Sequence, residues 1–417
     1  MADRDLRVAF VTLGCKVNQT ESESIAAELG IAGVGCLPDE ADVVVVNTCT
    51  VTGEADHKAR KAVRHALALP QGPVVVVTGC LAALDADALR DLGDRVVVEA
   101  DKDVVAARVR EHTGVAATTD RPVIVRSARA RAQLKVQDGC DAFCAYCIVP
   151  YARGAPRAVP AERVLAEAER LVGAGASEIV LTGINIGRYD DGGSRLPELV
   201  ERIAATGVPR IRLSSIEPDA VDEALLEAAA GTPAFCAHLH VPLQAGADGV
   251  LARMGRPYDT ATYAALVARA REMLPGMALT TDIIVGFPGE TDAEFGETLA
   301  FAEEMAFSRL HVFRYSARPG TPAATMHAQV PPEVRAERSA RLRELGEEMA
   351  AAYAGTHLGR TVEVLVERTG ADGTAEGVTR EYVRARIPRG ALPAGSLVSV
   401  SPERIEAGPV LVGRSLG

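Results

Sequence analysis

The chain begins with short valine-rich runs that alternate with alanine-rich, helix-favouring stretches. The apolar runs cover residues 8–13, 42–47, 74–78 and 95–99, and the helical stretches lie near 21–29, 55–69, 85–91 and 104–111. Continuous apolar runs separated by helices are typical of parallel strands that are buried on both faces. The pattern therefore predicts an N-terminal parallel-sheet α/β domain over residues 1–115.

A second alternating unit follows a stretch at 116–132 that has little apolar periodicity and is predicted to be a linker. Within 133–354, the strand candidates are 134–137, 178–182, 210–214, 238–242, 281–285 and 310–313. Six such units favour a partial (β/α)6 barrel, whose active site is expected at the carboxyl ends of the strands. Helical periodicity at 333–354 predicts a long outer helix.

The pattern changes again beyond residue 355. Short alternating runs at 362–366, 377–383 and 397–400 are separated by Gly and Pro residues. Such runs are typical of a small antiparallel β-barrel, which we place at 355–417. The predicted fold is thus α/β, with three parts.

Length and composition narrow the class of protein. The 417 residues correspond to about two to four domains, and 48% of them are hydrophobic. A net charge of −11 is too dilute to keep this chain unfolded. No apolar run approaches the ~20 residues that cross a bilayer, and the N-terminus lacks a secretory profile. We therefore expect a cytoplasmic protein that is not inserted in a membrane, and its eight cysteines are expected to be thiols.

Three of those cysteines lie close together in the sequence. Cys140, Cys144 and Cys147 have the spacing C-x3-C-x2-C in a glycine-led loop after a predicted strand. Three thiolates this close can hold three irons of a four-iron cluster and leave the fourth iron open. Structural zinc is the alternative, but the nearest downstream histidine is His238, too far along the chain for finger-like spacing. An iron–sulfur cluster is the preferred interpretation.

Three further cysteines share one position relative to the predicted sheet. Cys15, Cys49 and Cys80 each stand directly after a predicted strand of the N-terminal domain. The carboxyl ends of parallel strands meet at one edge, so the three thiols can converge there on a second ligand. They could equally be small apolar fillers at strand ends. Cys36 and Cys236 match no ligand position, and we predict that they only pack.

The segment Cys140-Asp-Ala-Phe-Cys144-Ala-Tyr146-Cys147 resembles the cluster motif of radical S-adenosylmethionine (SAM) enzymes. With the second cysteine set and the three-part order, the whole chain resembles the radical SAM methylthiotransferases. The resemblance implies two [4Fe-4S] clusters, one held by each cysteine set, and SAM as cofactor. It also implies that SAM binds the open iron, that one electron cleaves it to a 5′-deoxyadenosyl radical, and that Tyr146 flanks the adenine.

Within that family the motifs most resemble the branch that acts on N6-threonylcarbamoyladenosine next to the anticodon of tRNA. They are Thr12-Leu-Gly-Cys-Lys-Val-Asn-Gln19, Asn47-Thr-Cys-Thr-Val-Thr52, Gln137-Asp-Gly-Cys140, Cys147-Ile-Val-Pro-Tyr-Ala-Arg153-Gly, Leu181-Thr-Gly-Ile-Asn-Ile-Gly187 and His311-Val-Phe-Arg-Tyr-Ser316. Thr20 departs from the pattern, which has an aromatic or similar residue there. The resemblance implies a transferase that adds a methylthio group at C2 of this nucleoside.

Other functions remain open on the sequence alone. Within the family, the acceptor could instead be isopentenyl-type adenosine in tRNA or an aspartate of a ribosomal protein. From other classes, an iron–sulfur electron carrier or a noncatalytic RNA-binding protein would also use some of these features. Neither alternative, however, has a use for the open iron together with the large barrel.

The resemblance assigns SAM contacts to polar residues at the predicted strand ends. The expected cofactor-binding residues, besides Tyr146, are Thr182, Gly183, Ser214, Glu217, Gln244 and Asp282. A small residue such as Gly183 leaves backbone groups accessible to a ligand. For each of these residues a turn or capping role is the alternative. His238, His240 and His311 alternate with apolar residues and are expected to be core or supporting histidines rather than metal ligands.

The resemblance further implies that the C-terminal barrel is a TRAM domain that binds RNA. Arg380, Tyr382, Arg384 and Arg386 are the candidate RNA-binding residues, since arginines contact phosphate and a tyrosine offers a stacking face. The expected partners are tRNA and an electron donor such as a flavodoxin or ferredoxin. Neither a membrane nor DNA is expected as a partner.

Overall fold

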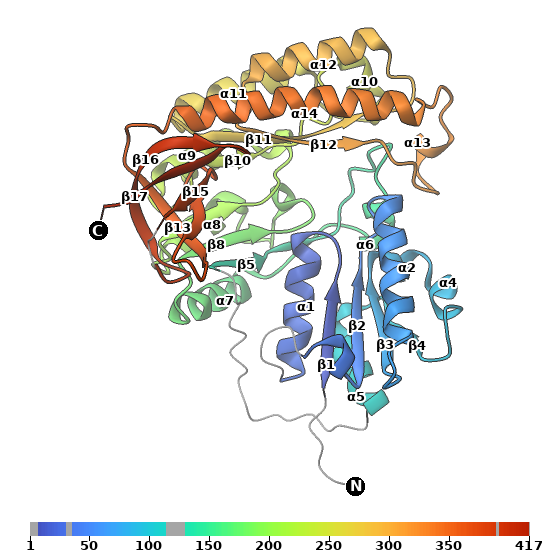
Figure 1. Ribbon diagram of the computed structural model, residues 1–417. Coiled ribbons are helices and arrows are strands. Elements are labelled where there is room, and N and C mark those ends of the chain that lie inside the picture. Colours follow the sequence, from blue (N-terminus) through green and yellow to red (C-terminus); the bar gives the residue numbers. More distant parts are fainter. Residues whose placement is uncertain (1–6, 31–35, 114–129, 389–391, 417) are drawn as a thin grey trace.

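The computed structural model describes residues 7–30, 36–113, 130–388 and 392–416. Figure 1 shows an N-terminal α/β domain, a central open barrel and a small C-terminal β-barrel, with one long helix running along the central barrel to the C-terminal one. The predicted α/β class with this three-part arrangement is confirmed. None of the helices within the described ranges is long and apolar enough to cross a membrane.

The N-terminal domain is a four-stranded parallel sheet with helices on both faces. Its strands are β1 (Val8–Thr12), β2 (Val43–Thr48), β3 (Val74–Gly79) and β4 (Val96–Val98), hydrogen-bonded in that order. Its helices are α1 (Lys16–Glu28), α2 (Gly53–Leu67), α3 (Cys80–Leu84), α4 (Ala86–Arg90) and α5 (Val105–Thr113), with short 3-10 turns at Pro38–Glu40 and Lys102–Val104. All six residues of β2 are buried, as a central strand covered on both faces requires.

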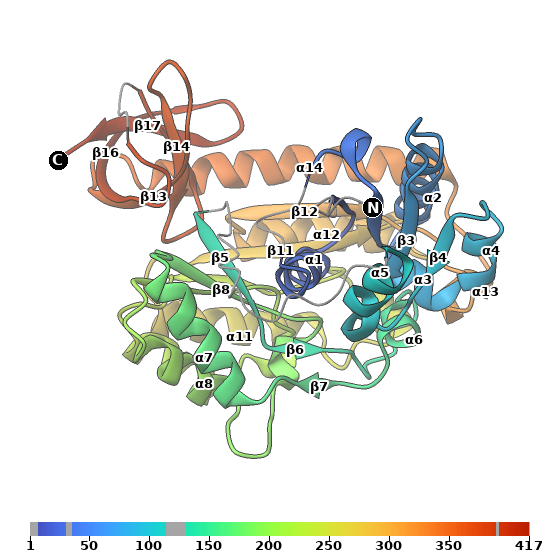
Figure 2. The ribbon, with the colours of Figure 1, turned by 90° about the horizontal axis from the view of Figure 1, so that it is seen from below.

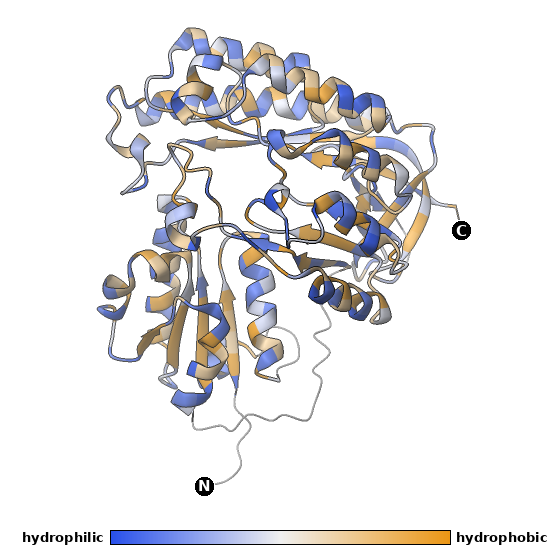
Figure 3. Ribbon diagram, turned by 180° about the vertical axis from the view of Figure 1, so that it is seen from behind, coloured by the Kyte–Doolittle hydropathy of each residue, from blue (hydrophilic) through white to orange (hydrophobic). Residues whose placement is uncertain are grey.

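Two opposite apolar layers hold the helices onto this sheet. Ile25 of α1 and Val109 of α5 pack on one face, while Val63 of α2 and Leu89 of α4 pack on the other. Figure 3 shows the apolar strands lying between helices whose outer sides are polar. The predicted linker at 116–132 lies mostly outside the described residues, and Arg131–Lys135 already form β5.

The central barrel contains two three-stranded parallel sheets. The first consists of β5 (Arg131–Lys135), β8 (Glu178–Thr182) and β9 (Arg210–Leu213), and the second of β10 (His238–His240), β11 (Ala278–Val285) and β12 (Arg309–Arg314). Parallel bridges between Ile211 and Phe235 and between Ser215 and His240 join the two sheets into one open arc. The six predicted strands are therefore all present, and they surround an interior.

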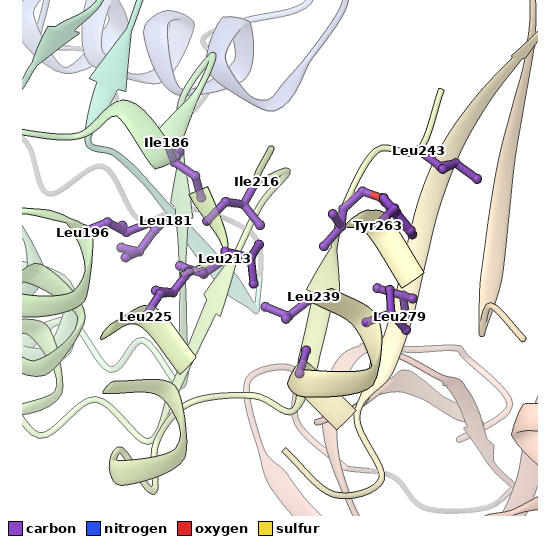
Figure 4. Close-up of a cluster of buried hydrophobic side chains, with 14 of the residues drawn as sticks. Leu181, Ile186, Leu196, Leu213, Ile216, Leu225, Leu239, Leu243, Tyr263 and Leu279 are labelled. Atoms are coloured by element: carbon purple, nitrogen blue, oxygen red, sulfur yellow. The ribbon is translucent and has the colours of Figure 1, made fainter. Parts of the chain in front are cut away.

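Helices cover the outside of the arc. They are α7 (Ala161–Gly173), α8 (Leu196–Ala204), α9 (Glu223–Gly231), α10 (Asp248–Met254), α11 (Thr260–Met273), α12 (Asp292–Met305) and α13 (Pro322–Thr325). Figure 4 shows Leu213, Leu239 and Leu279 from successive strands in the buried layer beneath them. Side chains alternate across a strand, so the residues on either side of each leucine along its strand point into the barrel.

A short hairpin-like segment and one long helix complete the central part. Strand β6 (Gln137–Asp138) pairs antiparallel with β7 (Arg157–Ala158), and α6 (Val149–Arg153) lies in the loop between them. Two 3-10 turns occur at Ile186–Arg188 and Pro218–Ala220. The predicted outer helix is α14 (Pro332–Gly355), which packs along β12 and leads into the C-terminal barrel (Figure 2).

The C-terminal part is a closed five-stranded barrel. Its strands are β13 (Val362–Thr369), β14 (Ala375–Thr379), β15 (Arg384–Ile387), β16 (Leu397–Glu406) and β17 (Val410–Ser415), closed in the order β13-β14-β15-β17-β16. The single strand expected at 377–383 is wrong, because β14 ends at Thr379 and a turn follows. In that turn Tyr382 has φ of 67°, which no strand residue adopts.

Candidate functional site

The cysteines that follow β1, β2 and β3 lie at one edge of the N-terminal sheet. Cys15 is the residue before α1, Cys49 follows β2, and Cys80 begins α3. Gly14 has φ of 104°, and a Cβ built on it would lie 2.9 Å from the Sγ of Cys49. Only glycine brings the β1 loop this close, so the conformation of Gly14 places Cys15 beside Cys49.

The three thiols of this N-terminal set are close enough to affect one another's ionisation. Burial raises the pKa of the Cys49 thiol, and the Cys80 and Cys15 thiols raise it further. Burial also raises the pKa of Cys80, while the nearby Arg153 guanidinium opposes the shift. A bound metal cluster would keep these thiols deprotonated through its own positive charge.

The loop between β6 and α6 carries Cys140, Cys144 and Cys147. Its start requires glycine, because Gly139 has φ of 75° and a Cβ there would lie 2.0 Å from the Ala155 carbonyl oxygen. The Cys140 amide donates to the Gly154 carbonyl at 3.0 Å, and the Cys147 amide donates to the Cys144 carbonyl at 2.9 Å. Burial, together with the other two thiols, raises the pKa of Cys147 to about 12.

Neither cysteine set is arranged like a single-ion site. Four sulfurs around zinc at about 2.3 Å lie roughly 3.8 Å apart. Across the described residues, the one group of three Cys, His, Asp or Glu side chains whose ligand atoms all lie within 4.8 Å of one another contains no cysteine. The wider separation within each set fits a larger group such as an iron–sulfur cluster.

Gln137 fixes the cysteine loop to the end of β8. Its side-chain nitrogen donates to the carbonyls of Asp138 and Gly139, both at 2.8 Å. Its side-chain oxygen accepts from the amides of Ile184 at 3.1 Å and Asn185 at 2.8 Å. The sequence places Gln137 in a motif but does not indicate this role, because its hydrogen bonds to Ile184 and Asn185 join segments that are far apart in the chain.

Thr182 and Gly183, two predicted SAM contacts, lie at the end of β8, beside the hydrogen bonds of Gln137. Thr182 is buried, and its carbonyl accepts from the Val136 amide at 2.9 Å. A Cβ on Gly183 would lie 2.9 Å from the Gln137 carbonyl oxygen, so this position admits only glycine without displacement. Burial raises the pKa of the Cys140 thiol, and a hydrogen bond from the Asn185 side chain opposes that shift, so Asn185 lies next to the thiol.

Arg256 is a second residue that the sequence did not reveal. One of its guanidinium nitrogens donates to the Cys144 sulfur at 3.0 Å, and the other pairs with Glu217, a predicted SAM contact. The guanidinium also lies 5.0 Å from the ring centre of Tyr258. Glu217 therefore forms an ion pair with the same Arg256 guanidinium that contacts the cysteine loop.

Tyr146, Ser214 and Gln244 are the next three predicted contacts. Tyr146 packs edge-on against Phe287, with 6.4 Å between ring centres. Ser214 follows β9, and its buried hydroxyl has no hydrogen-bond partner among the described residues. Gln244 has φ of 68°, and its main chain exchanges hydrogen bonds of 2.8 Å with Asp282 and Ile284.

Asp282, the last predicted SAM contact, is held by two histidines. Its Oδ1 lies 3.3 Å from His240 Nε2 and 3.2 Å from His311 Nδ1. Burial raises the pKa of Asp282, but the hydrogen bonds from both imidazoles outweigh burial and hold it well below the ordinary value. This carboxylate thus belongs to a distinct cluster on β10, β11 and β12.

A buried ionic network joins the two cysteine sets. Arg153, at the end of α6, donates to Asn18 Oδ1 at 2.7 Å, to Glu21 Oε1 at 2.9 Å and to Asp138 Oδ1 at 2.9 Å. Asn18 in turn lies 3.6 Å from the Cys15 sulfur. Residues next to each cysteine set are therefore bound to the same guanidinium.

A second contact closes the other side of this interface. Arg318, which follows β12, donates to Thr50 Oγ1 at 2.7 Å and to Asp56 Oδ2 at 2.6 Å. Thr20, where the sequence departs from the family pattern, contacts Gln133 of β5 at 3.4 Å. The cysteine-bearing edge of the N-terminal sheet therefore faces the central barrel (Figure 1).

Two of the four candidate RNA-binding residues are partly buried against the central barrel. The Tyr382 ring lies 4.9 Å from the Arg212 guanidinium and 4.8 Å from the His238 ring centre. Arg380 donates to the carbonyls of Pro233 and Phe235. These contacts occupy both side chains, and this argues against the prediction that they contact RNA.

Arg384 and Arg386 lie on the outer side of β15. Arg384 is exposed, and its guanidinium donates to the Gly408 carbonyl. Arg386 is half-buried and pairs with Glu406 and Glu376. Of the two packing cysteines, Cys236 is fully buried and Cys36 is partly buried against the N-terminal core.

Family models match both cysteine-bearing parts of the chain. Residues 134–302 match the radical SAM superfamily, and residues 7–99 match the uncharacterized protein family UPF0004. The first match contains Cys140, Cys144 and Cys147, and the second contains Cys15, Cys49 and Cys80.

Curated relatives extend over nearly the whole chain. It is 39% identical to the threonylcarbamoyladenosine tRNA methylthiotransferase MtaB of Bacillus subtilis, with 90% of this chain and 89% of the relative covered. The enzyme of the same name from Thermotoga maritima is 38% identical, with 90% of each covered. The tRNA-2-methylthio-N(6)-dimethylallyladenosine synthase of Erythrobacter litoralis is 34% identical, with 95% of this chain and 94% of the relative covered.

Solved structures share the fold at lower identity. The radical SAM methyltransferase TsrM of Kitasatospora setae, with a SAM analogue bound, is 17% identical with a TM-score of 0.52, covering 68% of this chain and 64% of that one. The cobalamin-dependent SAM radical enzyme OxsB is 11% identical with a TM-score of 0.52, covering 84% and 58%.

Proposed function

Because the chain belongs to the family of radical SAM methylthiotransferases that modify tRNA, we propose that it replaces the C2 hydrogen of N6-threonylcarbamoyladenosine in tRNA with a methylthio group. The relatives named for this nucleoside are 38–39% identical to the chain. Those named for the dimethylallyl nucleoside are 34–37% identical and stand as the second candidate. The higher identity to the first group agrees with the sequence motifs, which most resemble those of the threonylcarbamoyladenosine branch.

One observation carries the proposal: two separate three-thiol sets lie on facing domains, and Arg153 connects them. A ring C–H bond is not acidic enough for removal by an ordinary side-chain base, so a radical route is required. A four-iron cluster at Cys140, Cys144 and Cys147 supplies, when bound, the electron that cleaves SAM to a 5′-deoxyadenosyl radical. Cys15, Cys49 and Cys80 would hold a second cluster, which would supply the sulfur.

The chain's own residues hold this arrangement rigid. Gln137 locks the cysteine loop against β8, and Arg256 donates to the Cys144 sulfur and so stabilises it as a thiolate ligand. Arg153 pairs with both Glu21 of the N-terminal domain and Asp138 of the central part, and so ties the facing domains together. Positioning of this kind is what a reaction between two distant groups demands.

The SAM contacts that we propose are Tyr146, Thr182, Gly183, Ser214, Glu217 and Gln244. The unpartnered, buried hydroxyl of Ser214 is the best supported of them, because a buried polar group without a partner costs free energy unless a ligand supplies one. For tRNA we propose Arg384 and Arg386. A flavodoxin or ferredoxin is the proposed electron donor.

Mass analysis of tRNA nucleosides tests the acceptor directly. Cells that lack the gene should lose the methylthio derivative and accumulate N6-threonylcarbamoyladenosine, and the wild-type gene should restore it. A Cys144→Ala gene is the matched control and should not restore it. Loss of the methylthio dimethylallyl nucleoside instead would overturn the acceptor and leave the enzyme class intact.

A further inference from the structure

Three side chains on the last strands of the central barrel form a compact group that neither cysteine set uses. His240, Asp282 and His311 each offer one ligand atom, and these atoms all lie within 4.8 Å of one another. Both imidazoles approach the same carboxylate oxygen, at 3.3 Å from His240 and 3.2 Å from His311. The group was not expected from the sequence, which placed Asp282 beside SAM and the histidines in supporting roles.

Strand register explains why these residues meet inside the barrel. His240 pairs with Thr280 across β10 and β11, and Asp282 pairs with His311 across β11 and β12. Leu239 and Leu279, which alternate with them, belong to the buried layer under the helices (Figure 4). The His240, Asp282 and His311 side chains therefore share the opposite, interior face.

A supporting hydroxyl orients one imidazole. Thr280 Oγ1 lies 2.9 Å from His240 Nδ1, which leaves His240 Nε2 directed at Asp282. The same hydroxyl lies 3.0 Å from His238 Nε2. A hydrogen bond to the second ring nitrogen is the usual way in which proteins orient a metal-binding histidine.

We propose that His240, Asp282 and His311 bind a divalent transition-metal ion in a two-histidine, one-carboxylate site. Such ligands lie about 2.0–2.2 Å from an ion, so tetrahedral or octahedral angles separate neighbouring ligand atoms by roughly 3.0–3.4 Å. The separations of 3.2 and 3.3 Å fall within that range. Three protein ligands leave coordination positions open toward the barrel interior, where oxygen ligands of an anionic substrate can reach the ion.

The site differs chemically from the cysteine sets, and this makes it measurable in the cluster-loaded protein. Imidazole and carboxylate accept Mn²⁺, whereas thiolates favour softer metals. Mn²⁺ is therefore the probe, followed by the loss of its free-ion electron paramagnetic resonance signal during titration. Competition with Zn²⁺, added after Mn²⁺ has bound, then compares the two ions at the same site.

Four variants and the wild type decide the outcome. The wild type should bind one Mn²⁺ per chain, and Asp282→Asn and His311→Gln should each weaken binding at least about tenfold. His327→Gln changes an exposed histidine elsewhere and should bind like the wild type. Thr280→Val should weaken binding by about 10- to 100-fold, as loss of an orienting partner does.

Two results would overturn the proposal. One is a wild type that takes up no Mn²⁺ at micromolar protein, in which case the three side chains form only a hydrogen-bonded relay. The other is Mn²⁺ binding that Asp282→Asn and His311→Gln leave unchanged, which would place the ion elsewhere. Thermal unfolding of each variant shows that it is folded, and half-buried His311 is the safer position if Asp282→Asn unfolds. The readout does not depend on methylthiolation.

Discussion

The guanidinium of Arg153 donates a 2.7 Å hydrogen bond to the side-chain oxygen of Asn18, although 135 residues separate them in the chain. Asn18 also donates to the carbonyls of Leu13 and Thr48, each at 2.9 Å, which ties it to the ends of β1 and β2. A single buried pair thus couples the edge that bears the N-terminal cysteines to the loop that bears the others.

Arg153→Met should destabilise the folded protein by about 3–5 kcal/mol, because it leaves the buried carboxylates of Glu21 and Asp138 with too little positive charge. Urea unfolding followed by circular dichroism measures this loss. Arg157→Met is the matched control, since Arg157 is exposed and its contact with Asp138 is long, at 3.8 Å. It should cost under about 0.5 kcal/mol; an equal loss in both variants would refute the role of the network.

Stability should fall in acid through the same network. Burial raises the pKa of Asp138, but Arg153 and Lys135 outweigh burial and hold it well below its ordinary value. The folded state therefore binds fewer protons than the unfolded state below pH ~4, where an unfolded Asp titrates. The stabilisation is complete above that pH and declines by up to about 1.4 kcal/mol per unit as pH falls toward the folded pKa.

Asp138→Asn tests this acid dependence. The variant should be less stable than the wild type at pH 7, and the difference in free energy of unfolding should shrink as pH falls from 5 to 3. Denaturant unfolding across that range measures it. A difference that stays constant with pH would show that Asp138 does not contribute through its charge.

Alanine variants of the two cysteine sets should lose different activities. Cys144→Ala should abolish formation of 5′-deoxyadenosine from SAM, because the open iron is no longer held. Cys49→Ala should keep most of that cleavage and lose methylthio transfer. Cys36→Ala is the control and should retain both activities. Iron and sulfide analysis accompanies the assay, with about eight irons per chain expected in the control.

Arg256→Met should make the cluster at Cys144 harder to reduce, because it removes a positive charge and a hydrogen bond to sulfur. A shift of about 59 mV corresponds to a tenfold change in a one-electron equilibrium. Potentiometric titration monitored by electron paramagnetic resonance measures it. Arg253→Met is the control, because Arg253 lies nearby in α10 but pairs with Glu294. It should leave the reduction potential unchanged.

Arg384→Ala should weaken tRNA binding and lower the slope of log affinity against log salt by about one, as loss of one phosphate contact does. Tyr382→Ala should instead lower thermal stability, because its ring packs on Arg212 and His238 of the central barrel. Fluorescence anisotropy at several salt concentrations separates the two effects. If Tyr382→Phe weakened tRNA binding without changing stability, its hydroxyl would be an RNA contact after all.

Strands such as β2 and β8 were predictable because they are short, largely apolar runs between helix-favouring stretches. The sequence predicted buried strands at these places, and Val43–Thr48 and Glu178–Thr182 are buried strands in the structure. The C-terminal strand boundaries were less accurate, because the turn at Tyr382 depends on a backbone conformation that its residue type does not reveal.

Spacing predicted the set of Cys140, Cys144 and Cys147, and position after strands together with the family resemblance predicted Cys15, Cys49 and Cys80, whereas the residues that support both sets left no such signal. Gln137, Asn185 and Arg256 act through contacts with segments far along the chain, and such contacts leave no local pattern. The surroundings of Tyr382 were not predictable for a related reason. A tyrosine among arginines looks like a nucleic-acid surface, yet the arginines that it meets, Arg131 and Arg212, belong to the central barrel.

The contact between the C-terminal barrel and the central barrel is polar and buried. Fully buried Arg210 donates to the Glu363 carboxylate at 2.9 Å and to the Glu363 carbonyl at 2.7 Å, and Arg212 donates to the Arg380 carbonyl at 2.9 Å. Separating the barrels would remove these hydrogen bonds and leave Glu178 of β8 as the carboxylate that Arg210 and Arg212 share, which opposes separation. This buried contact favours one position of the C-terminal barrel, so an RNA held there would be presented to the central barrel at a constant distance.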